Sequence, residues 1–145
     1  MWSVEHTERT TATSADVWAI WEDVAGWPRW DGAVTGCRLD GPFAVGTRGT
    51  LSLKHGRDVP FLMTEVRPLD GFADVTRLPL ARLRFVHELT DDGEDGLLVT
   101  HRVEITGPLA FVFARVIGSD IERDLPASVR ELVRLAQQPA ARVAA

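Results

Sequence analysis

Hydrophobic residues recur with two different periods along the chain, and the first change falls near residue 13. Residues 3–12 are rich in Val and Thr, which favour extended structure, so we expect a first strand there. Thr13 and Asp16 have the spacing of a helix-capping box. Apolar residues then follow at helical spacing until Gly26 and Pro28 interrupt them: Val17, Ile20, Trp21 and Val24. We expect a short helical turn over residues 28–31, since proline suits a first helical turn.

Six extended runs come next, separated by short segments rich in Gly, Pro and Asp. Their regular spacing is typical of strands joined by tight turns, so we expect an antiparallel meander. The runs are Val34–Leu39, Thr47–Lys54, Val59–Arg67, Phe72–Leu78, Arg82–Thr90 and Leu97–Thr106.

The helical period returns after Gly107 and Pro108 and continues to about Gln138. Pro126 lies inside this segment and cannot donate the helical hydrogen bond, so we expect a kink over residues 122–125. Residues 1–138 form one predicted domain, and we expect the tail 139–145 to be disordered. The apolar stripe of the long helix can cover one face of a sheet: Leu109, Phe113, Val116, Ile117, Ile121, Leu125, Val129, Leu132 and Leu135.

Short sequence motifs occur in a fixed order along nearly the whole chain. They are VW at 17–18, WEDV at 21–24, WPRWD at 27–31, LDGP at 39–42, GTRG at 46–49, TEV at 64–66, FVH at 85–87, THRV at 100–103 and GPL at 107–109. In this order they make the chain resemble the START-like, or SRPBCC, superfamily, and within it the polyketide cyclase/dehydrase-like proteins.

The resemblance implies an α+β class and a helix-grip (START-like) fold with the order β-α-α-β-β-β-β-β-β-α. In that fold a seven-stranded antiparallel sheet wraps around the long C-terminal helix and encloses an elongated cavity, which the short helices close at one end. Relatives bind lipids, sterols, polyketides or plant hormones, and only some are enzymes. The resemblance therefore carries no catalytic residue over to this chain.

Composition narrows the choice of partners. The formal net charge of -5 argues against nucleic acid or an anionic membrane as the main partner. The one cysteine, Cys37, excludes a disulfide within the chain and suits a reducing compartment. No secretory signal and no apolar run of membrane-spanning length is visible. We expect a cytoplasmic protein, monomeric or homodimeric, without membrane insertion.

Two histidines stand among apolar residues on strand faces that should point inward. His87 shares its face with Phe85, and His101 shares its face with Val99, because side chains alternate across a strand. The loop between these runs is centred near Glu94, and a symmetric hairpin about it pairs position 87 with position 101. We expect the two imidazoles to face each other on the concave side.

The first strand adds His6 and Glu8 to the same neighbourhood. They share a face, and the family pattern puts that face inward beside the last strand, near His101. An inward glutamate needs a partner, and an imidazole is a natural one. We interpret His87 and His101 first as a structural pair, then as groups that orient a ligand, then as a general acid or base. A zinc site built on His6, His87 and His101 ranks last because their spacing matches no known motif, so we predict no metal and no other cofactor.

The tryptophans and the long helix allow two interpretations each. Trp27 and Trp30 belong to a group of four tryptophans within thirteen residues, which favours packing of the short helices on the sheet. Alternatively, one of them lines the cavity mouth and stacks on a flat ligand. Phe113, Ile117 and Ile121 either fill the core or line the cavity.

Three functions remain open at this point. The first is binding of a small, mostly apolar, aromatic, lipid-like or polyketide-like molecule between the sheet and the C-terminal helix. The second is an enzyme of the cyclase, dehydratase or isomerase type, with His87 or His101 as general acid or base. The third is a protein-interaction or regulatory module whose interior is filled. The sequence names neither the ligand nor the reaction.

Overall fold

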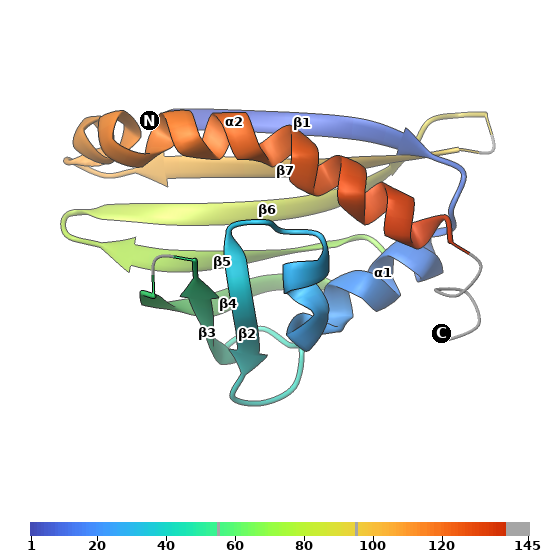
Figure 1. Ribbon diagram of the computed structural model, residues 1–145, viewed down its shortest axis with the longest axis horizontal. Coiled ribbons are helices and arrows are strands. Elements are labelled where there is room, and N and C mark those ends of the chain that lie inside the picture. Colours follow the sequence, from blue (N-terminus) through green and yellow to red (C-terminus); the bar gives the residue numbers. More distant parts are fainter. Residues whose placement is uncertain (55, 95, 139–145) are drawn as a thin grey trace.

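The computed structural model describes residues 1–54, 56–94 and 96–138, so the tail 139–145, for which we expected disorder, lies outside the described residues. The elements follow the predicted order (Figure 1). They are β1 Trp2–Thr10, α1 Ser14–Glu22, the 3₁₀ helix η1 Val24–Arg29, β2 Val34–Leu39, β3 Arg48–Leu53, β4 Asp58–Arg67, β5 Gly71–Leu78, β6 Ala81–Asp91, β7 Leu97–Thr106 and α2 Ala110–Ala136.

Local interactions explain where the two short helices begin and end. The capping box at the start of α1 is confirmed: the Asp16 backbone N–H donates to Thr13 Oγ1 at 3.1 Å, and the Thr13 N–H donates to Asp16 Oδ2 at 3.0 Å. The second helical segment differs from our expectation of a turn over residues 28–31. It is a 3₁₀ helix that begins earlier, at Val24, and includes Pro28. The Trp27 indole N–H donates to the carbonyl of Trp21 at 2.9 Å and ties this segment to α1.

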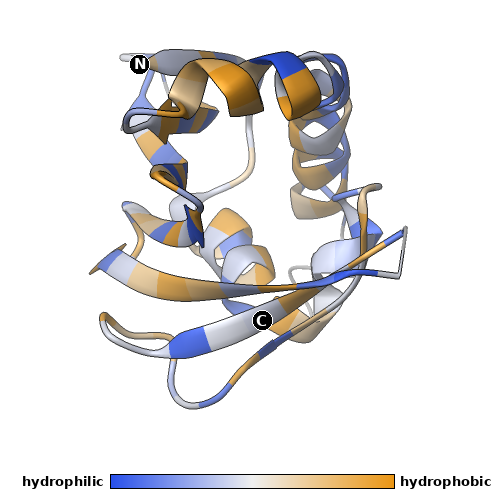
Figure 2. Ribbon diagram, turned by 90° about the vertical axis from the view of Figure 1, so that its left-hand side faces the viewer, coloured by the Kyte–Doolittle hydropathy of each residue, from blue (hydrophilic) through white to orange (hydrophobic). Residues whose placement is uncertain are grey.

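One seven-stranded antiparallel sheet forms the body of the molecule. Its strand order is β1-β7-β6-β5-β4-β3-β2, so the predicted meander is confirmed and the first strand closes beside the last. Viewed along the long axis, the sheet curves, and hydrophobic and hydrophilic bands alternate along its strands (Figure 2). The α+β helix-grip architecture expected from the resemblance is the observed one.

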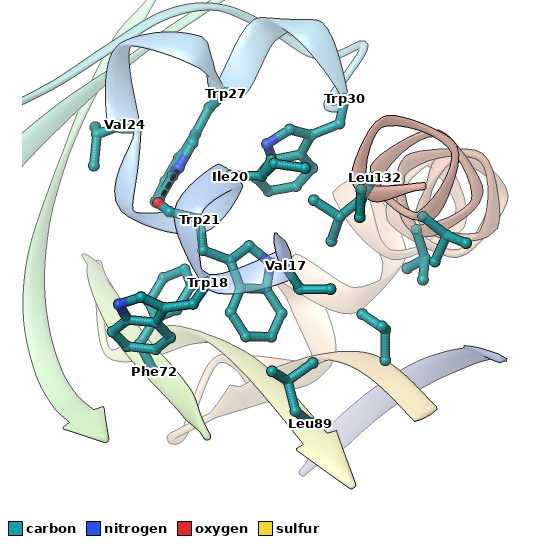
Figure 3. Packing of buried hydrophobic residues seen from close by; sticks show 14 of the residues in the cluster. Val17, Trp18, Ile20, Trp21, Val24, Trp27, Trp30, Phe72, Leu89 and Leu132 are labelled. Carbon is teal, nitrogen blue, oxygen red and sulfur yellow. Dashed lines mark hydrogen bonds between the residues drawn. The ribbon is translucent and has the colours of Figure 1, made fainter. Parts of the chain in front are cut away.

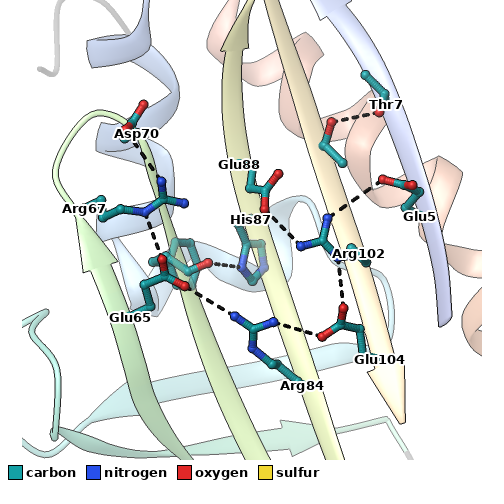
Figure 4. Close-up of polar contacts among 12 residues, drawn as sticks. Glu5, Thr7, Glu65, Arg67, Asp70, Arg84, His87, Glu88, Arg102 and Glu104 are labelled. Atoms are coloured by element: carbon teal, nitrogen blue, oxygen red, sulfur yellow. Dashed lines mark hydrogen bonds and ion pairs between the residues drawn. The ribbon is translucent and has the colours of Figure 1, made fainter. Parts of the chain in front are cut away.

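The outer, convex face of the sheet carries a network of ion pairs (Figure 4). Arg84 contacts Glu104 at 2.9 Å and Glu65 at 3.3 Å, and Arg102 contacts Glu88 at 3.0 Å and Glu104 at 3.2 Å. Charged cross-strand pairs of this kind fix which face of β6 and β7 meets solvent. The residues that alternate with them, including both histidines, therefore face inward.

Helix α2 covers the inner face unevenly. It lies over the edge formed by β1 and β7 and changes direction partway along, as expected for a helix that contains Pro126 (Figure 1). Its second half is anchored in the core, where Val129 and Leu132 are fully buried. In its first half Val116 is 67% exposed. No helix within the described residues has the length and apolar character needed to cross a bilayer.

Candidate functional site

Three histidines lie side by side on the inner face, on adjacent strands. His6 of β1 is in register with His101 of β7, and His101 is in register with His87 of β6. The rings of His87 and His101 meet edge to face, with centroids 4.6 Å apart. The predicted pairing of positions 87 and 101, facing inward, is confirmed.

The surroundings of His87 and His101 are aromatic and closely packed. The ring of Phe72 stacks on His87 with centroids 3.9 Å apart, and His87 Nδ1–H donates to the Phe72 carbonyl at 3.4 Å (Figure 4). The Trp21 indole N–H donates to His101 Nε2 at 3.3 Å, which assigns the proton of the neutral imidazole to Nδ1. Burial disfavours the charged form of both rings. It lowers the pKa of His87 to about 3 and holds the pKa of His101 well below its usual value, with positive charge on His87 or His6 acting in the same direction.

Tryptophans of α1 and η1 pack together on the inner side of the sheet (Figure 3), and the rings of Trp21 and Trp30 contact the histidine pair. Trp27 and Trp30 are each 4% exposed, and the Trp30 ring lies 5.5 Å from that of His101. The structure therefore places both tryptophans inside the core, away from an open mouth. The indole N–H of Trp30 has no acceptor among the described residues. We call this packed end the Trp–His core: Trp21, Trp27, Trp30, Phe72, His87, Val99 and His101.

His6 and Glu8 sit at the margin of the Trp–His core and are half-buried. His6 Nε2 contacts Glu8 Oε1 at 3.2 Å, so the expected imidazole partner is present. Arg130 of α2, which the sequence did not point to, donates to the same oxygen at 2.9 Å. The hydrogen bond from His6, followed by that from Arg130, lowers the pKa of Glu8. Across the described ranges, no group of three or more His, Cys, Asp or Glu side chains has the arrangement of a metal site.

Next to the first half of α2, side chains on the inner face are less completely buried than in the Trp–His core. Phe85 belongs to β6, a central strand, and both of its cross-strand neighbours, Asp74 and Val103, are buried. Phe85 itself is only half-buried. An inward side chain in the middle of a sheet keeps accessible surface only if space remains unfilled above it. Phe113, Ile117 and Ile121 of α2 are half-buried as well and pack around the same cluster. We call this region the inner-face trough: Phe85, Phe113, Ile117 and Ile121.

Asp74 lies beside the trough and was not among the residues that the sequence singled out. It points to the inner face of β5, between Met63 of β4 and Phe85 of β6, and is 2% exposed. Burial raises the pKa of its carboxyl group to about 8. The available signal was an acidic residue two positions after an inward Phe72. It was weak because Ala73 and Val75, on the other face of β5, are apolar too.

One further group, Cys37, lies within electrostatic reach of Asp74, and Asp31 acts on the same thiol. Cys37 of β2 is half-buried, and burial raises the pKa of its thiol to about 12, with Asp74 and Asp31 adding to the effect. Burial also raises the pKa of Asp31, and Asp124 of α2 contributes. A thiol with so high a pKa is a poor nucleophile at neutral pH. This side of the interior therefore combines apolar surface with acidic groups.

The outer face carries a hollow with a volume of about 340 Å³. It lies over Thr64, Glu65, Arg84 and Glu104, whose charged members are already engaged in the ion-pair network. The inner-face trough differs from it in offering apolar surface with one polar group beside it. That combination is typical of a site for small molecules, so we take the trough as the candidate site.

Solved structures similar to this chain share its fold. Truncated norcoclaurine synthase from Thalictrum flavum has a TM-score of 0.72 at 14% identity, covering 94% of each chain. The same enzyme in complex with dopamine and hydroxybenzaldehyde gives 0.68 at 15% identity, covering 92% of this chain and 85% of that one. A protein from Mesorhizobium loti gives 0.72 at 17% identity, covering 92% and 96%.

The sequence comparisons are more specific about the family. A search of curated proteins finds no match. The model of one family, described as polyketide cyclase / dehydrase and lipid transport, matches residues 1–137, which is nearly the whole chain. The START-like resemblance inferred from the sequence motifs is therefore confirmed. This chain belongs to the polyketide cyclase / dehydrase and lipid transport family.

Proposed function

We propose that this protein binds a small, mostly apolar molecule in the inner-face trough. The observation that carries the proposal is the half-buried state of Phe85 on a central strand, together with that of Ile117 and Ile121 of α2, which pack against the same cluster. Apolar surface left accessible inside a fold is a source of binding energy, at roughly 25 cal/mol for each Å² that a ligand covers. The Thalictrum flavum enzyme, whose fold is similar, has been solved with the small aromatic molecules dopamine and hydroxybenzaldehyde.

For the histidines we propose a structural role. A general base works best when its pKa lies near the working pH, and burial brings the pKa of His87 to about 3. The aromatic rings packed around His87 and His101 also occupy the space that a substrate would need next to them. These observations favour the structural pair over the catalytic alternative. The half-buried trough likewise argues against an interaction module with a completely filled interior.

Binding to the trough can be tested with the neutral fluorophore N-phenyl-1-naphthylamine, whose emission rises in apolar surroundings. We expect saturable binding with one site per chain. Ile117→Arg puts a charge into the trough and should weaken binding at least tenfold. Val116→Arg is the matched control: it is the next residue of the same helix, is 67% exposed, and should leave the affinity within twofold. Emission that does not saturate, or equal effects of both variants, would refute the proposal.

A further inference from the structure

Asp74 is a buried acid without a partner. The residue is 2% exposed, and no hydrogen bond or ion pair joins its carboxyl group to a described residue. Its strand position aims it at the inner face, next to Phe85 of the trough. Buried carboxyl groups are normally paired, because an unpartnered one is costly. A group that lacks a partner beside an accessible apolar surface is free to bind one that arrives with a ligand.

The charges around Asp74 determine which kind of ligand group can pair with its carboxyl group. The β6 and β4 neighbours of Asp74 are the uncharged Phe85 and Met63, and His87, one inward position along from Phe85, is held neutral by burial. From other elements, Cys37 lies within electrostatic reach of Asp74, and Asp31 in turn acts on Cys37.

The contacts of the neighbouring acidic residues Asp31 and Asp124 place no unpaired cation beside Asp74. Among the described residues, the Asp31 carboxylate accepts one hydrogen bond, from the backbone N–H of Ala33 at 3.1 Å. Asp124, which acts on Asp31 from α2, is paired with Arg123 at 3.2 Å. Within the described part of the chain, no Lys or Arg forms an ion pair with Asp74 or Asp31. The described residues therefore give Asp74 no cationic partner.

We propose that Asp74 anchors the amino group of the ligand, so that the trough binds an apolar molecule that ends in a protonated amine. This inference rests on the proposed function and adds the chemical class of the ligand. The ammonium group supplies the missing partner of the carboxylate, and the apolar part covers Phe85, Ile117 and Ile121. A ligand carboxylate would meet the like charge of Asp74, which no described cation offsets by an ion pair, so it should be rejected.

Binding of an amine should change the number of protons that the protein holds, and this change can be measured. In the protein without ligand the pKa of Asp74 is about 8, so Asp74 is protonated in most molecules at pH 7. An arriving ammonium ion stabilises the carboxylate form, so the carboxyl proton leaves to the buffer while the amine keeps its own proton. Close to one proton should be released for each amine bound. An uncharged alcohol of the same shape should release almost none.

The experiment compares decylamine, decanol and decanoate, which share one apolar chain, as competitors of N-phenyl-1-naphthylamine at pH 7 and pH 9. Calorimetry in two buffers of different ionisation enthalpy counts the protons released. We expect the wild-type protein to bind decylamine at least tenfold more tightly than decanoate at pH 9. Asp74→Asn should keep its affinity for decanol within about twofold and lose the preference for the amine. Asp70→Asn is the matched control, since Asp70 is exposed and its nearest cation, Arg67, lies 3.8 Å away.

The outcomes separate the two proposals. If neither the fluorophore nor decanol binds saturably, the proposed function itself fails. If decanol binds but decanoate binds as well as decylamine, or Asp74→Asn keeps the preference for the amine, the proposed function stands and the inference about Asp74 is wrong. Should Asp74→Asn not fold, the proton count of the wild-type protein decides. Release of about one proton with decylamine and none with decanol supports the inference, and equal release refutes it.

Discussion

The two ends of the inner face are built from similar residues and differ in how completely they are filled. In the Trp–His core every large side chain is covered, and Trp21 and Val99 have no exposed surface. In the inner-face trough, aromatic and aliphatic residues of the same sheet and the same helix stay half-buried. Helix α2 contributes to both ends, with its second half anchored and its first half resting on the sheet edge.

Under the proposed function, this difference assigns stability to the Trp–His core and ligand binding to the trough. A filled core gains from every contact, and the Trp21 indole is paired internally with His101, although the Trp30 indole N–H has no acceptor among the described residues. The trough gives up some of that stabilisation, and beside it Asp74 remains buried without a partner. Departures from good packing and full pairing are expected where a protein keeps room for a ligand.

The largest effect should come from removing the centre of the Trp–His core. Trp21 packs edge to face on Phe72 and His87 and is fully buried, so Trp21→Ala should destabilise the protein by about 3–5 kcal/mol. Trp2→Ala is the matched control, because Trp2 is a half-buried tryptophan at the trough end and should cost no more than about 1–2 kcal/mol. Urea denaturation followed by circular dichroism measures both. Equal losses would mean that the two ends are equally packed.

The dependence of stability on pH should also distinguish the two ends, because their titrating groups act in opposite directions. The imidazoles of the Trp–His core have lowered pKa values when folded, so the unfolded chain binds more protons than the native one as the pH falls below about 6.5. Their contribution is complete above that pH and is lost on acidification. For His87 the loss between pH 7 and pH 5 is about 2 kcal/mol, and His101 adds to it in the same direction.

Asp74 opposes this trend and provides the control. Its pKa is raised from 3.8 to about 8 on folding, so over that window the native state holds the extra proton, and stability rises as the pH falls. In the wild-type protein the two effects partly cancel between pH 7 and pH 5. In Asp74→Asn the histidine effect is left alone, so thermal denaturation should show a steeper loss on acidification. An unchanged or shallower slope in that variant would contradict the raised pKa assigned to Asp74.

The sequence was informative where a local pattern determines geometry. Thr13 and Asp16 marked the start of α1, because a capping box involves residues only three apart. The pairing of His87 with His101 followed from one hairpin loop and the alternation of side chains, both of which are local. The full element order also followed, since turn residues separate every strand.

The sequence was less informative where the answer depends on packing between distant elements. Asp74 escaped notice because β5 is apolar on both faces, so alternation could not tell which face was inner. Trp27 and Trp30 were candidates for an open mouth, and only the arrangement of η1 against the sheet shows that they are covered. Likewise, a hydrophobic stripe on a helix predicts which residues face inward but does not say how much space remains next to them.

The smallest effect on stability, and the most direct test of the unfilled space, should come from shortening an aromatic ring in the trough. Phe85→Leu removes atoms that already border unfilled space, so it should cost no more than about 0.5 kcal/mol of stability while weakening N-phenyl-1-naphthylamine binding severalfold. Phe61→Leu is the matched control. Phe61 is 3% exposed and stacks on Trp27 with centroids 6.0 Å apart, so the same truncation there should cost about 1–2 kcal/mol and leave binding unchanged. Chemical denaturation and probe titration of both variants measure the contrast, and a loss of stability at Phe85 as large as that at Phe61 would mean that the trough is filled.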